Sequence, residues 1–158
     1  MSKGLMTLEL YAPKAMETAT AGSIYLWGLG LAGETFELLR AMDGDGNVTL
    51  EAGDVLWYCV ATATCAGVLP GFITHFQRYP TCAPDLRTSL YQSVGDTVEH
   101  IKKALRANKA VDPEFMVPAL SKVARTLYWI TDERGMHYPP LGRFIEFPTG
   151  KNEDVGGR

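Results

Sequence analysis

Glu34-Thr-Phe-Glu37 and, thirteen residues later, Glu51-Ala-Gly-Asp54 place two pairs of carboxylates in otherwise apolar sequence. Residues three apart on a helix lie on one face, so each pair directs two carboxylates the same way. Carboxylates that face the interior of a helix bundle are costly unless a cation or hydrogen bonds compensate them. The pattern therefore predicts two neighbouring helices whose acidic pairs meet around hard divalent ions, and oxygen ligands favour Mg²⁺ or Mn²⁺.

The rest of the chain suits a compact globular domain. Its 158 residues predict a single all-α domain over residues 1–150 and a flexible tail over 151–158. Apolar residues make up 46% and charged residues 21%, which is ordinary for a soluble protein. Because the net charge is −3 and the isoelectric point about 5.6, no overall basic field attracts nucleic acid, and we expect no nucleic-acid partner.

The three cysteines, Cys59, Cys65 and Cys82, do not have the spacing of a zinc site. Their odd number and the absence of a visible signal peptide predict reduced thiols in the cytoplasm. The uncharged stretch over residues 55–74 is long enough to span a bilayer, but it contains a Pro70-Gly71 break and polar threonines. We interpret it as a buried helix and expect no membrane partner.

Apolar residues at helical spacing, with glycine and proline between the segments, predict an antiparallel all-α bundle of about five helices. The expected helices cover roughly residues 7–20, 23–42, 49–68, 84–108 and 113–132. Either Asn47 or Thr49 can cap the third helix, and Pro70-Gly71 is expected to end it. The segment over residues 71–84 is expected to be irregular.

The turn Asp43-Gly-Asp45-Gly-Asn47 has some features of a calcium-binding loop. In that loop the sixth position is glycine and the twelfth is glutamate, whereas Val48 and Asp54 stand here. We therefore interpret the segment as a turn between two helices.

A faint similarity links the two halves of the chain. Gly95-Asp96-Thr-Val-Glu99 follows the same order as Gly33-Glu34-Thr-Phe-Glu37, with acids at the second and fifth positions of each stretch. Further along, the alignment sets Ser121 opposite Glu51 and Ala124 opposite Asp54. The similarity fits either a degenerate internal repeat of a two-helix unit or chance agreement between amphipathic helices. A repeat would leave one full metal site per chain.

The sequence around the acids resembles that of the MazG-like nucleotide pyrophosphohydrolases, of the all-α NTP pyrophosphatase superfamily. Their pattern is ExxE followed by ExxD on adjacent helices of an all-α bundle. The flanking Gly30-Leu-Ala-Gly33-Glu34 and Gly53-Asp54-Val-Leu-Trp-Tyr58 match as well. The resemblance covers about residues 5–68. The longer second half is typical of the larger bacterial or phage members of the family.

The resemblance implies hydrolysis of a nucleoside triphosphate, often deoxy, between its α- and β-phosphates to give a monophosphate and pyrophosphate. Glu34, Glu37, Glu51 and Asp54 would be Mg²⁺ ligands, with Glu34 and Glu37 the first candidates for accepting a proton from the attacking water. Phage relatives that control the dNTP pool point weakly to dGTP. The alternatives are a dUTP- or dCTP-directed all-α diphosphatase, and a non-catalytic helical module that binds a nucleotide or a protein.

Other residues are weaker candidates for contacts with the substrate, and each also has a purely structural interpretation. Aromatic residues at helical spacing are more often core, and lysines or arginines more often form a solvated face. The candidates are Trp27, Tyr58, Asp96, Lys102, Lys103 and Arg106. The resemblance further implies a homodimer or homotetramer in the cytoplasm of a bacterium or a phage-infected cell.

Overall fold

The structure is a computed structural model, and it describes residues 7–19, 22–78 and 85–131. These residues are 83% helical and contain no strand, which confirms the all-α prediction. The six helices are α1 (Leu8–Glu17), α2 (Ile24–Met42), α3 (Val48–Cys65), α4 (Leu69–Arg78), α5 (Leu86–Arg106) and α6 (Pro113–Thr131).

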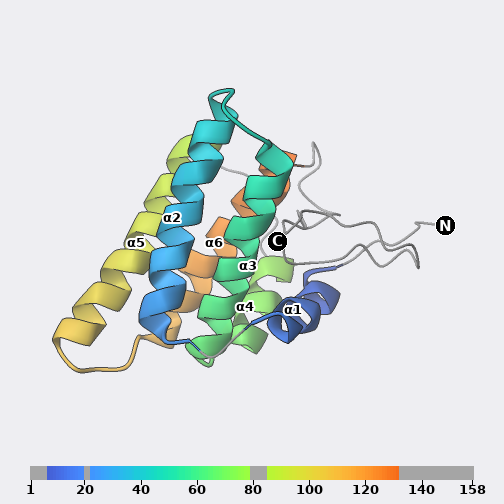
Figure 1. The fold of residues 1–158 in the computed structure, drawn as a ribbon. Helices are drawn as coiled ribbons and strands as arrows, with labels where there is room; N and C mark the ends of the chain where they lie inside the picture. The colour runs from blue at the N-terminus through green and yellow to red at the C-terminus, as the bar shows by residue number, and fades with distance from the viewer. Residues whose placement is uncertain (1–6, 20–21, 79–84, 132–158) are drawn as a thin grey trace.

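Two antiparallel helix pairs form the body of the bundle (Figure 1). The first pair is α2 and α3, joined by the turn over residues 43–47, and the second is α5 and α6, joined over residues 107–112. Helix α2 packs against α5, and α3 packs against α6, so α3 and α6 share the interior. The short helices lie at the side, with α1 against α3 and α4 against both α6 and α3.

Side-chain caps explain where several helices begin. Thr7 accepts a hydrogen bond from the backbone of Leu10, and Ser23 accepts one from Leu26. Asn47 accepts from the backbone of Leu50 at 3.1 Å and is therefore the cap of α3, rather than Thr49. Such side chains occupy backbone donors that have no partner within the first turn of a helix.

The prediction for the segment after α3 is wrong. We expected Pro70-Gly71 to end the third helix and residues 71–84 to be irregular, whereas α3 ends at Cys65 and Leu69–Arg78 forms α4; residues 79–84 lie outside the described part of the chain. Gly67, with a φ of 72°, makes the break. Pro70 then lies in the first turn of α4, where a missing backbone N–H is tolerated, and the described residues form six helices where about five were expected.

The interior is one cluster of apolar side chains contributed mainly by α3 and α6, with further residues from α1, α2 and α5 and with Phe72 and Phe76 of α4. The indole ring of Trp57 attaches helix α1 to α3. The Nε1–H of Trp57 donates to Ala15 O at 3.1 Å and to Thr18 Oγ1 at 2.8 Å. These bonds anchor α1 one helical turn away from the acidic residues of α3.

No helix in the described part of the chain is both long and apolar enough to cross a membrane. Cys59 is buried and Cys65 exposed, and both are free thiols. Cys82 and the expected tail over residues 151–158 lie outside the described residues.

Candidate metal centre

Three of the four predicted acids come together. One oxygen each of Glu34, Glu51 and Asp54 lies within 4.8 Å of the other two. Asp54 is fully buried, while Glu34 is partly buried at the margin of the bundle. Within the residues that the structure describes, no other set of three His, Cys, Asp or Glu side chains meets in this way.

The helix pair α2–α3 positions these three carboxylates. Glu51 and Asp54 lie in the first two turns of α3, one turn apart on the same face, and Glu34 comes from the middle of the facing helix. Small residues let the two helices approach closely. Ala52 and Gly53 are buried, and a Cβ on Gly30 would overlap the ring of Tyr58. The glycine in the Gly30-Leu-Ala-Gly33 segment therefore makes room for an aromatic side chain of α3.

Glu37 does not join this group. Its side chain is 54% exposed, and its Oε1 lies 3.6 Å from Nη1 of Arg40. Glu37 and Glu34 are one turn apart on α2, but 300° of rotation separates them around the axis, which leaves them about 60° apart. On α2 this offset leaves Glu34 facing α3 and Glu37 facing solvent, whereas the same offset on α3 keeps both Glu51 and Asp54 in the group.

Two buried tyrosines, Tyr11 close to Asp54 and Tyr128 close to Tyr11, are polar residues of the interior that the sequence did not indicate. Tyr11 of α1 is fully buried and Tyr128 of α6 is 2% exposed, and neither phenol oxygen has a hydrogen-bond partner among the described residues. Burial raises the pKa of Tyr11 well above its ordinary value, and the nearby Tyr128, Asp54 and Cys59 raise it further. Burial likewise raises the pKa of Tyr128, so both hydroxyls stay protonated near neutral pH.

The two aromatic candidates for base stacking differ in exposure. Trp27 is 7% exposed, and its ring meets Trp57 edge-on at 5.5 Å between centroids. Tyr58 is only partly buried, and its ring lies 4.9 Å from that of Trp57. Trp27 is thus a core residue, as the structural interpretation of aromatic spacing expected, and Tyr58 remains a candidate for contact with a ligand.

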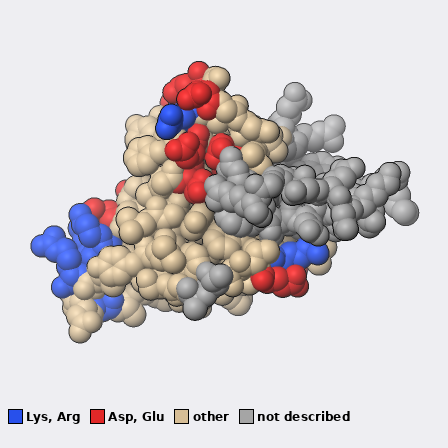
Figure 2. All heavy atoms as spheres, in the orientation of Figure 1, with Lys and Arg blue, Asp and Glu red and all other residues tan. Residues whose placement is uncertain are grey.

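The basic candidates lie away from the acids. Lys103 and Arg106 line a shallow hollow in the last turns of α5, where cations complement the helix dipole. Figure 2 shows acidic side chains gathered towards the α2–α3 turn and basic ones at the far end of α5. Lys102 pairs with Glu99 at 2.7 Å, and Asp96 is exposed on the same helix. The structure does not bring these side chains to the acid group within one chain.

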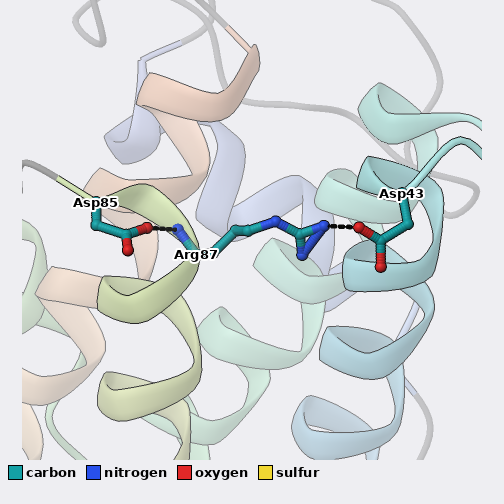
Figure 3. A network of polar contacts seen from close by, with 3 residues as sticks. All are labelled: Asp43, Asp85 and Arg87. Atoms are coloured by element: carbon teal, nitrogen blue, oxygen red, sulfur yellow. Dashed lines mark hydrogen bonds and ion pairs between the residues drawn. The ribbon is translucent and has the colours of Figure 1, made fainter.

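The acids of the turn at residues 43–47 are engaged elsewhere, in agreement with its interpretation as a turn. Asp43 pairs with the guanidinium of Arg87 at the start of α5, and Asp45 lies 3.5 Å from Nη2 of Arg40. In Figure 3 the backbone N–H of Arg87 also donates to Asp85, the cap of α5. The turn is therefore connected to the second helix pair through the ion pair of Asp43 with Arg87.

The group of Glu34, Glu51 and Asp54 fits a hard divalent cation. Mg²⁺ binds oxygen ligands at about 2.1 Å, so two ligands on opposite sides of the ion are about 4 Å apart. The spread of up to 4.8 Å between oxygens is close to that distance. All three donors are carboxylates, which favour Mg²⁺ or Mn²⁺ over softer metals, and their mutual repulsion favours any cation that enters.

Comparison with known proteins adds no relative. No protein-family model matches this chain, and neither the curated proteins nor the solved structures contain a significant match.

Proposed function

We propose that the protein is a Mg²⁺-dependent pyrophosphohydrolase that cleaves a nucleoside triphosphate, preferably a deoxynucleotide such as dGTP, into the monophosphate and pyrophosphate. The observation that carries the proposal is the meeting of Glu34, Glu51 and Asp54 from two facing helices. These are residues that the ExxE and ExxD resemblance assigns to metal binding. The resemblance supplies the substrate class and the cytoplasmic role in nucleotide metabolism.

In this proposal the three grouped carboxylates bind the metal. Bound Mg²⁺, with Mn²⁺ as a substitute, would neutralise the triphosphate, polarise its α-phosphorus and lower the pKa of the attacking water. Asp54 is the most constrained ligand because its side chain is fully buried in the bundle. Glu34 and Glu51, which are partly exposed, hold the side of the ion that faces the substrate.

Glu37 has a separate role in this proposal. Its carboxylate lies outside the group and faces solvent beside Arg40, so we assign it the role of accepting a proton rather than of binding the metal. A general base contributes typically 10²–10⁴-fold to a rate. Glu37→Gln should therefore lower kcat by about that factor while leaving Mn²⁺ affinity unchanged. Glu34 is the alternative base, and its variant should lose metal affinity as well.

The decisive experiment is product identification on a panel of all dNTPs and NTPs with Mg²⁺. We expect pyrophosphate and the monophosphate from wild-type protein, and no turnover from Asp54→Asn or Glu51→Gln. Glu99→Gln is the matched control, because Glu99 is a solvent-facing glutamate of α5 that pairs with Lys102. Circular dichroism of each variant shows whether the helices are intact.

Each other outcome selects a different function. Release of inorganic phosphate alone would contradict cleavage between the α- and β-phosphates. The highest kcat/KM for dUTP or dCTP would indicate the pyrimidine-directed diphosphatase. Thermal stabilisation by nucleotides without turnover, whatever the metal, would indicate the non-catalytic binding module.

We also propose that the chain acts as a homodimer or a dimer of dimers. Large apolar side chains remain exposed along α2, with Tyr25 at 54%, Leu29 at 67% and Phe36 at 68%. Tyr25 and Leu29 also line an apolar groove between α2 and α5 with a volume of about 180 Å³. Contiguous exposed apolar surface is common at protein interfaces. Light scattering should give at least twice 17.3 kDa for wild type and a smaller mass for Leu29→Glu. A fully active monomer would contradict this assembly.

A further inference from the structure

Large apolar side chains remain exposed on the side of the bundle formed by α2 and α5. These two helices run antiparallel. The groove between them brings Leu29, in the first half of α2, beside Lys102, near the end of α5. Asp43, just after α2, pairs with Arg87 at the start of α5. Of the seven large apolar residues that are exposed in the described part of the chain, five belong to α2 and α5, namely Tyr25, Leu26, Leu29, Phe36 and Tyr91.

Most of these residues form one continuous surface. On α2, Leu29 follows Tyr25 by four residues and Phe36 follows Leu29 by seven, which keeps all three on one side of the helix. On α5, Tyr91 precedes Val98 by seven residues, and Val98 lines the groove together with Leu29. We call the surface of Tyr25, Leu29, Phe36, Tyr91 and Val98 the α2–α5 face.

The α2–α5 face points away from the acid group. Glu34 follows Leu29 by five residues, which corresponds to about 140° of rotation around the axis of α2. Because Glu34 meets the acids of α3, Leu29 is directed away from α3. A molecule bound to the α2–α5 face would therefore leave the acid group of the same chain uncovered.

The two ends of the α2–α5 face differ in charge. At one end, the last two turns of α5 carry Lys102, Lys103 and Arg106, and Glu99 pairs with both lysines. At the other end acids outnumber arginines, and the charged residues there are Glu37, Arg40, Asp43, Asp45, Asp85 and Arg87. Figure 2 shows this separation between the end of α5 and the α2–α3 turn. One end of the face therefore suits an acidic apolar surface, and the other end suits a basic one.

Glycines occupy the middle of this surface on both helices. Gly33 lies one turn after Leu29 on α2, and Gly95 lies one turn after Tyr91 on α5. A glycine inside a helix costs stability relative to alanine. A Cβ on either glycine would meet no atom of the described chain within 4 Å, so internal packing does not require a glycine at these positions. Small residues at a helix contact allow another helix to approach closely.

We propose that a second copy of this chain docks on the α2–α5 face in antiparallel orientation, about a two-fold axis near Gly33 and Gly95. In a two-fold interface each copy presents the same surface, so the apolar middle of one face covers that of the other. The antiparallel orientation brings the basic end of each copy beside the acidic end of its partner. The inference deepens the assembly part of the proposed function, and it requires neither the metal site nor hydrolysis.

The experiment measures self-association of the full chain by sedimentation equilibrium. We expect wild type to form a dimer whose dissociation constant rises with NaCl, because salt screens the charges at the two ends. Phe36→Glu should raise that constant about 100-fold, since it places a carboxylate from each copy in the apolar contact. Leu10→Glu is the matched control and should associate as wild type does. Leu10 is 61% exposed, against 68% for Phe36, but it lies on α1, which packs against α3.

Charge reversals test the orientation. Lys103→Glu and Asp45→Lys should each weaken association about tenfold, because each replaces an attraction by a repulsion at both ends of the dimer. The double variant exchanges the two signs within one chain, so it should associate more tightly than either single variant if opposite ends meet. Lys122→Glu, at an exposed position of α6, is the control and should leave association unchanged. Circular dichroism of each variant shows whether the helices are intact.

Three results would overturn the proposal. A wild-type chain that stays monomeric at its highest soluble concentration would exclude a second copy as the occupant. Equal association of Phe36→Glu and Leu10→Glu would move the contact to another surface. A double charge variant that associates no better than the single variants would contradict the antiparallel orientation. A Mn²⁺ titration of the same samples separates these failures from that of the proposed function. A monomer that binds Mn²⁺ would contradict the dimer alone, and a dimer that binds none would contradict the metal site alone.

Discussion

The two helix pairs have similar acidic spacing but use it differently. In α2–α3, Glu34, Glu51 and Asp54 point into a shared space. In α5–α6, the corresponding Asp96 and Glu99 face solvent.

The positions that correspond to Glu51 and Asp54 are neutral in the second pair. Ser121 is buried and donates to Val117 O at 2.7 Å, and Ala124 is fully buried. The comparison shows that i and i+3 spacing alone does not make a site. What matters is whether the facing helix directs a further charge to the same point, so one pair can serve as a cation site and the other as its support.

The largest expected effect comes from placing a carboxylate in the second pair. Ala124→Asp puts a charge at a fully buried position where no partner acids or metal are expected. An uncompensated buried charge costs about 3–5 kcal/mol, so the variant should lose a large part of its free energy of unfolding in urea. Lys122→Asp, at an exposed position of the same helix, should change stability by less than about 0.5 kcal/mol. Equal losses from both variants would contradict the difference in burial.

Metal binding at the α2–α3 pair should stabilise the folded protein, and the α5–α6 pair should contribute nothing to this effect. At a Mn²⁺ concentration 100 times the dissociation constant, binding to the folded state adds about 2.7 kcal/mol. We therefore expect the melting temperature of wild type and of Glu99→Gln to rise with Mn²⁺ and to fall back on addition of a chelator. Asp54→Asn should lose most of this rise. A rise that survives in Asp54→Asn but disappears in Glu99→Gln would move the site to the second pair.

Substitutions of glycine by alanine in the two helix pairs are expected to change the stability by a smaller amount. Gly30 packs against the ring of Tyr58, so Gly30→Ala forces the ring to shift and should cost about 1–3 kcal/mol. A Cβ on Gly33 or Gly95 would meet no atom within 4 Å. Alanine at either position should stabilise its helix by about 0.5–1 kcal/mol. Urea unfolding of the three variants checks this, and a stabilising Gly30→Ala would show that α2 and α3 are less closely packed than described.

Local signals in the sequence were enough to predict much of the fold. Capping residues such as Asn47 and the Asp112-Pro113 start of α6 fix where helices begin, and these depend only on neighbouring backbone groups. The helix over residues 69–78 was not predicted, because a Pro70-Gly71 pair is compatible both with the end of one helix and with the first turn of the next. The buried side chains of Phe72 and Phe76, which pack against the bundle, favour the helix.

The candidate site was predictable in part for the same reason. The ExxE and ExxD spacing correctly grouped Glu34, Glu51 and Asp54, but it predicted Glu37 as a member of the same group. Only the rotation of α2 about its axis, set by packing against α3 and α5, separates Glu34 from Glu37. Tyr11 and Tyr128 are 117 positions apart in the chain, and no local pattern indicates that they lie close together in the interior.

The smallest expected effect distinguishes the caps of the corresponding helices α2 and α5. Ser23 caps α2 with a neutral hydroxyl, whereas Asp85 caps α5 with a carboxylate whose pKa is lowered chiefly by the hydrogen bond from the side chain of Thr88. A lowered pKa in the folded state means that the stabilisation is complete above the unfolded pKa and is lost as the pH falls through the folded one.

The melting-temperature difference between wild type and Asp85→Asn should therefore be positive at pH 7 and shrink below about pH 4. The difference for Ser23→Ala should be the same at pH 7 and pH 3, because a serine hydroxyl does not titrate in this range. Thermal melts at the two pH values measure both. A pH-dependent Ser23→Ala, or an Asp85→Asn difference that persists in acid, would mean that charge at the start of α5 does not distinguish the two helix pairs. The N-terminal stability of α5 would then have to come from the ion pair of Arg87 with Asp43 instead.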